Sequence, residues 1–491
     1  MSKGPRINYT KGNFTTRDNL GINSAGTSFQ AVLSPVINTV TPRAFYWIFA
    51  VWNYYDYHQN YKTEKKTTED FENNFLKKND YYFVLANLLT EGSDRDNLVG
   101  KDNCAVDLKE NDGPFAYNRG YFKAHFGGMQ YYVPGCQTLG LITYVDNDGN
   151  EFKFPKVTEK LGVPMAQAFE EIIKDTEYYK TYRLTQTPVP KEVLIELGKT
   201  ISLSMDGMEE CKKWLRKAFF ESSVYFDNST LIHSKDYLLF IDKTIGTRGM
   251  DSSKMRNVLY DTFYPGGPRE NELPDELKDV ARDWEVVIGR QYFTIAIEVI
   301  WRFMLIELTS PMVKEDWFRA CIKDTLWSID PDSLVVDLMK DAYYEFDERE
   351  KMALRGARGS KDVSMSLELA IKIMLSVCNR FKGREDIEQD LLYIGGQISV
   401  GMLLDRTKEH PMETISELAV FIMNEWVLKR HEQVAFRKLM DGRDGSFRDG
   451  YFIEKIDNKY HQRYIAYPDF TGNRMMQLKH VMEDLDMMES V

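Results

Sequence analysis

The segment from Tyr131 to Ile173 constrains the fold more than any other part of this chain. It holds an apolar, helix-like run that ends in LGLI (residues 139–142), then an NDG turn, a short second strand and a new amphipathic helix. Thr158 is placed to cap that last helix, in which Met165 and Phe169 recur at helical spacing. This order of elements is typical of a winged helix-turn-helix and predicts a winged-helix-like segment near 130–173.

The charge of this segment bears on its role. Winged helices that grip DNA usually present cationic side chains on the recognition helix or the wing. Residues 121–170 contain four lysines and five acidic residues, so the local charge is close to zero. We therefore expect a framework or docking module here, and direct DNA reading is the less favoured alternative.

The remaining pattern is mainly helical. Apolar residues make up 43% of the 491 residues and aromatic residues 13%, which predicts a chain that is folded along most of its length. Apolar periodicity predicts helices near 276–308, 312–327, 331–346, 363–381, 386–406 and 412–440. A hairpin is expected around Asp457-Asn458, followed by a helix over 473–488. The predicted fold class is mainly α with small β-hairpins.

Composition shifts along the chain suggest three domains. The first, 1–180, is a helical unit that ends in the winged-helix-like segment. The second, 181–410, is a central helical domain with a long loop over 245–275, where Gly, Pro and Ser cluster. The third, 411–491, is a basic helix-hairpin-helix segment.

The overall charge and the cysteines indicate a reducing compartment. Sixty-three basic and 75 acidic residues give a formal net charge of −12, so any contact with nucleic acid must be local. The five cysteines contain no CxxC pair, which predicts buried, reduced thiols. The first residues lack the apolar stretch of a signal peptide, and the most hydrophobic segment, 292–308, contains three charged residues. We expect a cytoplasmic protein without a membrane partner.

The C-terminal segment is basic within an acidic protein. Residues 426–480 contain eleven cationic and seven acidic residues, with tyrosines between them. Cations interleaved with aromatic rings are typical of nucleic-acid-binding surfaces. The candidate nucleic-acid-binding residues here are Lys429, Arg430, Arg437, Lys438, Arg443, Arg448, Lys455 and Arg463. The alternative is a solvated helix face next to an ordinary tyrosine-rich hairpin.

A second basic patch covers residues 349–361, with five cations, one acid and two glycines. Basic loops with glycine can hold phosphates through side chains and backbone amides. Arg355 and Arg358 are therefore further nucleic-acid candidates, and an exposed linker is the alternative.

One group of residues has the composition of a metal-dependent nuclease site. Asp146 or Asp148, followed by Glu151 and Lys153, offers two carboxylates and a lysine. The spacing is too tight, because all of them fall at one hairpin tip. A cryptic metal-dependent nuclease is therefore kept only as an alternative.

Other catalytic signatures are weaker still. His233 and Lys235 match the start of a phospholipase D-type motif, but Phe240 stands where its aspartate is expected. The sequence has no Walker A loop, HExxH, GxSxG or GxGxxG motif. We assign no catalytic residue, metal ligand or cofactor.

Both ends of the chain resemble a group of prokaryotic proteins. The stretches that carry the resemblance are RDNLG…TPRAFYWIFAVW (17–52), MQYYVPGCQTLGLI (129–142), HEQVAFRKL (431–439) and FTGNRMMQL (470–478). The group is encoded in defence islands beside ATPases, helicases, nucleases or methyltransferases. The resemblance implies a role against phage or mobile elements as one subunit of a multi-gene system, and it supplies no catalytic residues.

These observations lead to one expected function and two alternatives. We expect a non-catalytic subunit that scaffolds a partner from its own operon, either an ATPase of the SMC or helicase type or a nuclease, and that contacts DNA through its basic C-terminal region. The alternatives are the cryptic nuclease and a winged-helix transcriptional regulator.

Overall fold

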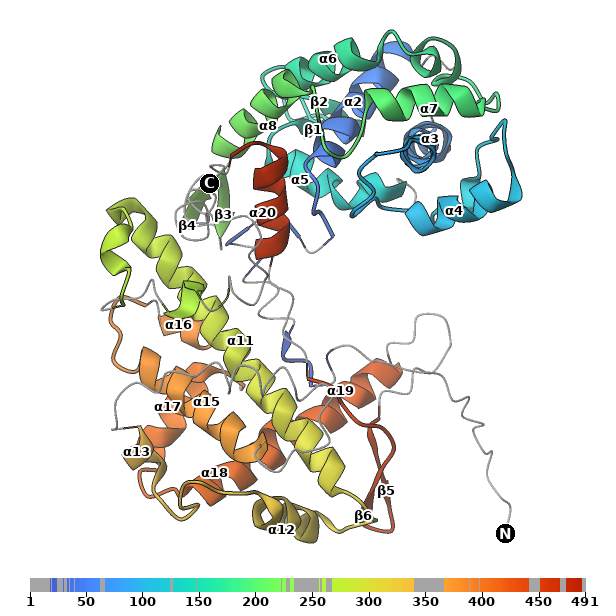
Figure 1. The fold of residues 1–491 in the computed structure, drawn as a ribbon. Helices are drawn as coiled ribbons and strands as arrows, with labels where there is room; N and C mark the ends of the chain where they lie inside the picture. Colours follow the sequence, from blue (N-terminus) through green and yellow to red (C-terminus); the bar gives the residue numbers. More distant parts are fainter. Residues whose placement is uncertain are drawn as a thin grey trace, which may run out of the picture. The chain divides into compact units, whose positions relative to one another are not determined.

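The fold is mainly helical with small antiparallel hairpins, which confirms the predicted class (Figure 1). The computed structural model describes residues 18, 20–23, 30, 33–34, 36–38, 40–61, 67–123, 127–146, 148–221, 223–226, 230–233, 256, 258–261, 267–339, 366–387, 389–396, 398–440, 451–468 and 474–487.

The chain divides into two compact units that are not contiguous in sequence. Unit 1 is Met1–Phe29 with Val286–Thr471, and unit 2 is Gln30–Glu285 with Gly472–Val491. The expected boundaries near 180 and 410 do not coincide with this division. The two units are defined by packing between residues that are far apart in sequence, and such packing cannot be predicted from shifts in composition.

Unit 2 is built mostly from short helices. Its elements are α2 (Phe45–Asn60), η1 (Asp70–Leu76), α3 (Lys77–Leu89), α4 (Lys101–Glu110), η2 (Arg119–Tyr121), η3 (Gly127–Tyr131), α5 (Val133–Thr138), β1 (Ile142–Val145), β2 (Glu151–Val157), α6 (Gly162–Ile173), η4 (Tyr178–Tyr182), α7 (Lys191–Thr200), α8 (Glu209–Glu221), β3 (Ser223–Phe226), β4 (Thr230–His233), η5 (Glu270–Glu272), the first part of α11 (Asp275–Glu307) and α20 (Met475–Asp484).

Helix α2 forms the centre of unit 2. It is buried on nearly all sides, as expected of a helix with apolar and aromatic residues around its whole circumference. The ring of Phe45 stacks on Phe83 of α3 at 4.5 Å, and Trp47 meets Phe219 of α8 edge-on at 5.6 Å. Phe169 of α6 closes the cluster against Phe45 at 6.0 Å.

The winged-helix-like segment has the predicted order of elements, α5-β1-β2-α6. Its hairpin packs inward, because Phe154 of β2 contacts Phe71 at 4.7 Å and is only 8% exposed. Helix α5 has six residues, and a Cβ on its Gly135 would lie 2.5 Å from the Trp47 indole nitrogen. Gly135 and Cys136 are the buried residues of α5, so one face of this helix packs closely and the framework role stays a prediction.

Two arginines, Arg43 and Arg474, tie α20 and its start to unit 2. Arg43 pairs with Asp484 of α20 at 3.0 Å and also with Asp94, and it donates to the Leu203 carbonyl at 2.7 Å. Arg474 donates to the carbonyls of Ser34 and Ile37. These contacts explain why the last residues belong with the N-terminal helices.

Unit 1 contains the larger part of α11. After Val286 its elements are the remainder of α11, α12 (Lys314–Asp324), α13 (Val335–Leu338), α15 (Ser366–Phe381), α16 (Gln389–Leu392), α17 (Val400–Glu409), α18 (Ile415–Phe421), η6 (Ile422–Leu428), α19 (Lys429–Met440), β5 (Ile453–Ile456) and β6 (Lys459–Gln462).

The C-terminal hairpin β5-β6 confirms the predicted turn. Asp457 and Asn458 both have positive φ, 48° and 64°, as a two-residue type I′ turn requires. The Phe452 amide, next to β5, donates to His431 Nε2 on α19 at 3.1 Å. Buried His431 therefore has a structural role in tying the hairpin to α19.

Some predicted elements differ from the structure. The single helix expected over 386–406 is two helices, α16 and α17, because Gly395 and Gly396 between them have φ of +105° and +65°. Much of the expected loop at 245–275 lies outside the described residues, and α11 begins at its end, at Asp275.

The cysteine prediction is confirmed, because all five thiols are buried and unpaired. Of the helices that the structure describes, none combines the length and the apolar character that crossing a bilayer requires.

Candidate protein-docking groove

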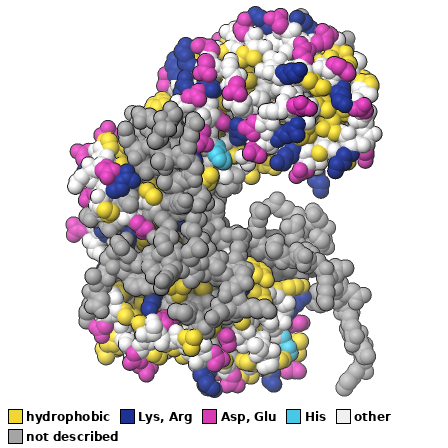
Figure 2. Space-filling view, in the orientation of Figure 1, with side chains coloured by type: hydrophobic (Ala, Val, Ile, Leu, Met, Phe, Trp, Pro, Cys, Tyr) yellow, Lys and Arg dark blue, Asp and Glu magenta, His cyan; other side chains and the backbone are white. Residues whose placement is uncertain are grey.

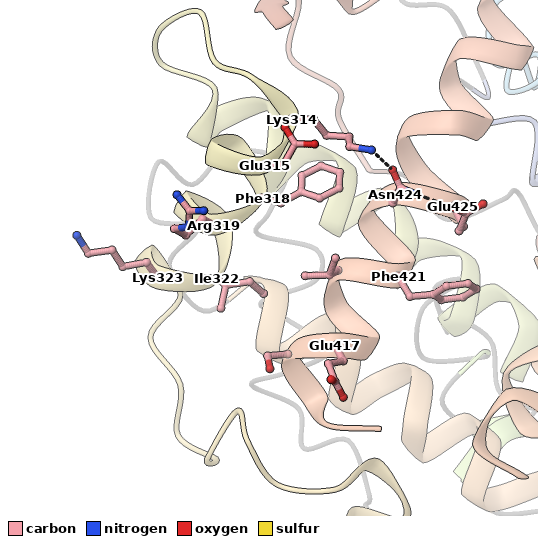
Figure 3. A pocket seen from close by; sticks show the side chains of 12 residues that line it. Lys314, Glu315, Phe318, Arg319, Ile322, Lys323, Glu417, Phe421, Asn424 and Glu425 are labelled. Atoms are coloured by element: carbon pink, nitrogen blue, oxygen red, sulfur yellow. Dashed lines mark hydrogen bonds between the residues drawn. The ribbon is translucent and has the colours of Figure 1, made fainter. Parts of the chain in front are cut away.

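A groove of about 700 Å³ lies in unit 1 between α12 and the continuous helix formed by α18 and η6 (Figure 3). Lys314 Nζ at the start of α12 donates to Asn424 Oδ1 on η6 at 3.4 Å. Figure 3 shows Ile322 and Lys323, near the end of α12, toward the Glu417 end of the opposite helix, so the two helices run antiparallel. Each helix contributes positions i, i+1, i+4, i+5, i+8 and i+9 to the lining. The lining residues are Lys314, Glu315, Phe318, Arg319, Ile322, Lys323, Ser416, Glu417, Val420, Phe421, Asn424 and Glu425.

The apolar stripe of α12 is wider than the part of it that packs in the core, and the remaining apolar side chains form one wall of the groove. Trp317 and Cys321 face the core, where the Trp317 indole donates to the Met304 carbonyl at 2.7 Å. Phe318 and Ile322, each one position further around the helix, are left to line the groove. Phe318 remains only 6% exposed.

The opposite wall is set by the start of α18. The Thr414 side chain and Glu417 form a capping box that fixes where the helix begins. Ile415 and Leu418 are buried, whereas Val420 is 41% exposed in the groove. The guanidinium of Arg406 lies 3.5 Å from the centre of the Phe421 ring and restrains it.

Two further apolar side chains lie near one end of the groove. Leu326 follows α12 by two residues and is 63% exposed, and Met412 precedes α18 by three residues and is 74% exposed. Because the helices are antiparallel, the end of α12 and the start of α18 lie at the same end of the groove. Exposed apolar side chains beside an apolar groove are typical of protein-binding surfaces.

The two walls carry opposite charge. The α12 wall has three cations, Lys314, Arg319 and Lys323, and one acid, Glu315. The α18-η6 wall has two acids, Glu417 and Glu425, and no cation. By contrast, on the face drawn in Figure 2 cationic and anionic side chains are mostly interspersed over the described surface.

Sequence reasoning missed this groove because apolar residues on a predicted helix are assigned to one core face. The usable signal is the width of the stripe over 412–425, where Val420 and Phe421 extend the face made by Ile415, Leu418 and Ala419. A stripe wider than one core face predicts a second apolar contact.

The predicted nucleic-acid residues on α19 differ in their surroundings. Lys429 pairs with Glu425 at 2.5 Å in an exposed i,i+4 ion pair. Arg430 donates to the carbonyls of Leu20 and Gly21 at 2.9 and 3.2 Å, so it anchors the N-terminal segment. Arg437 is exposed on the same helix.

The hairpin cations lie beside aromatic rings. Lys455 Nζ lies 5.3 Å from the centre of the Tyr460 ring, and the Arg463 guanidinium lies 5.5 Å from that of Tyr464. Tyr460 is only 5% exposed, and burial raises its pKa to about 12. The tyrosines interleaved with these cations are Tyr451, Tyr460, Tyr464 and Tyr467. Tyr467 is the most exposed of them, at 58%, and buried Tyr460 cannot serve as a stacking surface.

The other candidates lie beyond the described part of the chain. Arg355, Arg358, Arg443 and Arg448 fall in residues that the structure does not describe, and of Lys438 only the helical backbone is described. The basic region therefore stays a prediction.

The nuclease-like carboxylate Asp146 takes part in shaping its turn. It accepts hydrogen bonds from the amides of Asp148 and Asn150 at 2.9 and 2.8 Å, and the Asn150 side-chain amide, the amides of Asn150 and Asp148 and that of Gly149 lower its pKa. Within the described residues, no three His, Cys, Asp or Glu side chains are grouped so that they could hold a metal ion.

Comparison with known proteins adds no assignment. No protein-family model, curated protein or solved structure that we compared with this chain matches it. The interpretation of the groove therefore depends on its own geometry.

Proposed function

We propose that this chain is a non-catalytic subunit of a multi-protein prokaryotic defence complex directed against phage or mobile elements. In this proposal it scaffolds a partner encoded in the same operon, either an ATPase of the SMC or helicase type or a nuclease. The observation that supports a scaffolding role is the apolar groove between α12 and α18-η6, with Val420, Leu326 and Met412 exposed in or beside it. The defence setting is supported only by the resemblance at the two ends of the chain.

A single charge in the groove tests the docking role. We expect Val420→Asp to reduce the recovery of the partner roughly tenfold or more, because burying an unpaired carboxylate in an apolar contact costs more than about 1.4 kcal/mol. The measurement is the amount of each operon product that co-purifies with the tagged full chain after expression of the whole operon.

Val106→Asp is the matched control. Val106 is 51% exposed on α4 of unit 2, so the same substitution is made at a similarly exposed helical position that does not line the groove. Equal partner recovery with both variants would remove the groove from the proposal. Cleavage or ATP hydrolysis by the purified chain alone would contradict the non-catalytic role.

We further propose that the basic C-terminal region contacts DNA. Neutralising Arg437, Lys438, Arg443 and Arg448 together is expected to weaken binding and to reduce the slope of log K against log salt by about 0.9 for each phosphate that the variant no longer neutralises. Filter binding over a range of salt concentrations measures both. Arg430 is left intact, because its replacement would release the backbone of residues 20–21.

The control neutralises four exposed lysines on helices of unit 2. These are Lys101, Lys109, Lys199 and Lys213. This control variant has the same change in net charge as the C-terminal variant. If its affinity for DNA decreases less, DNA binding is assigned to the C-terminal region. An unchanged slope in the C-terminal variant rejects DNA binding there.

A further inference from the structure

We infer that the occupant of the groove is an amphipathic α-helix of the partner with one acidic and one basic flank. This inference rests on the proposed docking role and goes beyond it by specifying the chemistry of the docked segment. Three observations carry it: the backbone pairing of the walls, the length of the lining, and the separation of charge between the walls.

The walls favour a helix over an extended peptide. Both walls are helical, so their backbone amides and carbonyls are used within the helices themselves. An extended segment in this groove would leave its own backbone groups without partners at the apolar lining, which is costly. A helix satisfies its backbone internally and presents only side chains.

The length of the groove sets the length of the occupant. On each wall the lining runs over nine residue steps, from Lys314 to Lys323 and from Ser416 to Glu425. At about 1.5 Å per residue this is roughly 14 Å, or between two and three turns of a docked helix.

The charges of the walls specify the flanks. Arg319 pairs with Asp316 at 2.9 Å and Glu425 pairs with Lys429 at 2.5 Å. The remaining lining charges are Lys314, Lys323 and Glu315 on the α12 wall, a net +1, and Glu417 on the α18-η6 wall, a net −1. A helix with an acidic flank toward α12 and a basic flank toward α18 meets opposite charge on both sides. Turning such a helix end to end would place like charges together, so the walls also fix its direction.

Three designed peptides of about 18 residues test this inference. They share one apolar stripe at i, i+4, i+7 and i+11 and differ only in their flanks, which are Glu on one side and Lys on the other, Lys on both, or Glu on both. Binding of each labelled peptide to the full chain is measured by fluorescence anisotropy at low salt. We expect the peptide with mixed flanks to bind roughly fivefold tighter than either uniform peptide.

A variant of the chain makes the test reciprocal. Replacing Arg319 and Lys323 by glutamate makes both walls acidic, and both positions are exposed. In this variant the peptide with Lys on both flanks should become the tightest binder. Val420→Asp should abolish binding of all three peptides, and Val106→Asp should not.

The possible results are distinct. No binding by any peptide, or a ranking of peptides that the Arg319→Glu and Lys323→Glu variant leaves unchanged, overturns the inference. If Val420→Asp nevertheless reduces partner recovery in the operon experiment, the proposed docking function stands and only the helical occupant is rejected. A dimer of the chain alone that Val420→Asp dissociates would show that a second copy fills the groove, and would overturn the inference as well.

Discussion

Replacing Asp56 by alanine is expected to lower the free energy of unfolding by about 3–5 kcal/mol. The Asp56 side chain is fully buried on α2, and the Arg183 Nε lies 3.2 Å from its carboxylate. Asn60 donates to the same carboxylate at 2.7 Å. Removing the carboxylate leaves the Arg183 charge, with 10% of its side chain exposed, without its counter-charge.

The effect extends to a second buried cation. Lys78 Nζ donates to the carbonyls of Arg183 and Thr185, both at 2.7 Å. Burial lowers its pKa to about 7, and the Asp56 carboxylate opposes that shift. Without Asp56 the pKa of Lys78 falls further, so Lys78 loses its proton and only Arg183 keeps a charge there. Helices α2, α3 and η4 then lose the carboxylate that joins them.

The measurement is urea unfolding of the full chain, followed by tryptophan fluorescence and circular dichroism. Glu69→Ala is the matched control, because Glu69 pairs with Arg119 at 3.2 Å on the surface, with both side chains more than half exposed. We expect that control to change the free energy of unfolding by less than about 1 kcal/mol. Equal losses in the two variants would show that the Asp56 pair contributes no more than a surface pair.

Replacing Asp80 by asparagine is expected to remove a large pH dependence of stability. Tyr121 and the Gly128 amide donate to Asp80 Oδ2, the latter at 2.7 Å. Its Oδ1 is buried and has no partner among the described residues. Burial raises the pKa of Asp80 from 3.8 to about 7, although the hydrogen bonds from Tyr121 and Gly128 oppose this shift.

The sign of the effect follows from linkage. The folded chain holds this proton up to about pH 7, whereas the unfolded chain loses it near pH 4. Stability therefore falls as the pH rises from about 4 to about 7, by roughly 4 kcal/mol from this group alone. An asparagine side chain cannot ionise, so the Asp80→Asn variant should gain stability relative to the wild type across this window and no further above it.

Urea unfolding at pH 4, 5.5 and 7 measures this difference. Asp102→Asn, at an exposed position of α4, controls for the removal of one carboxylate and should give a curve parallel to that of the wild type. A curve for Asp80→Asn that also runs parallel to the wild type would mean that Asp80 is ionised in the folded chain.

Local patterns predicted local structure well. The Asp457-Asn458 turn, the helix at 275–307 and the order of elements between 133 and 173 follow from turn chemistry and apolar periodicity, which act within a few residues. The pair Gly395-Gly396 also indicates the break between α16 and α17, although apolar periodicity alone predicted one continuous helix.

The candidate groove could not be predicted in the same way. Val420 and Phe318 have the same apolar character as their buried neighbours, and only the packing of α12 against α18 leaves Val420 exposed. Arg430 was predicted to contact DNA because the sequence shows its charge. The sequence does not show that its guanidinium donates a hydrogen bond to the Leu20 carbonyl.

The sequence by itself determined the helical class and the turn of the C-terminal hairpin, because spacing and turn chemistry act locally. The burial of the five cysteines was predicted from their lack of paired spacing. The tertiary structure decided which residues form each unit, through contacts such as Arg43 with Asp484, 441 positions apart. It also decided that an apolar stripe shared by two helices becomes a groove with oppositely charged walls. Such features arise when elements far apart in sequence pack together. The apolar periodicity of a helix does not specify which other helix its apolar face will contact.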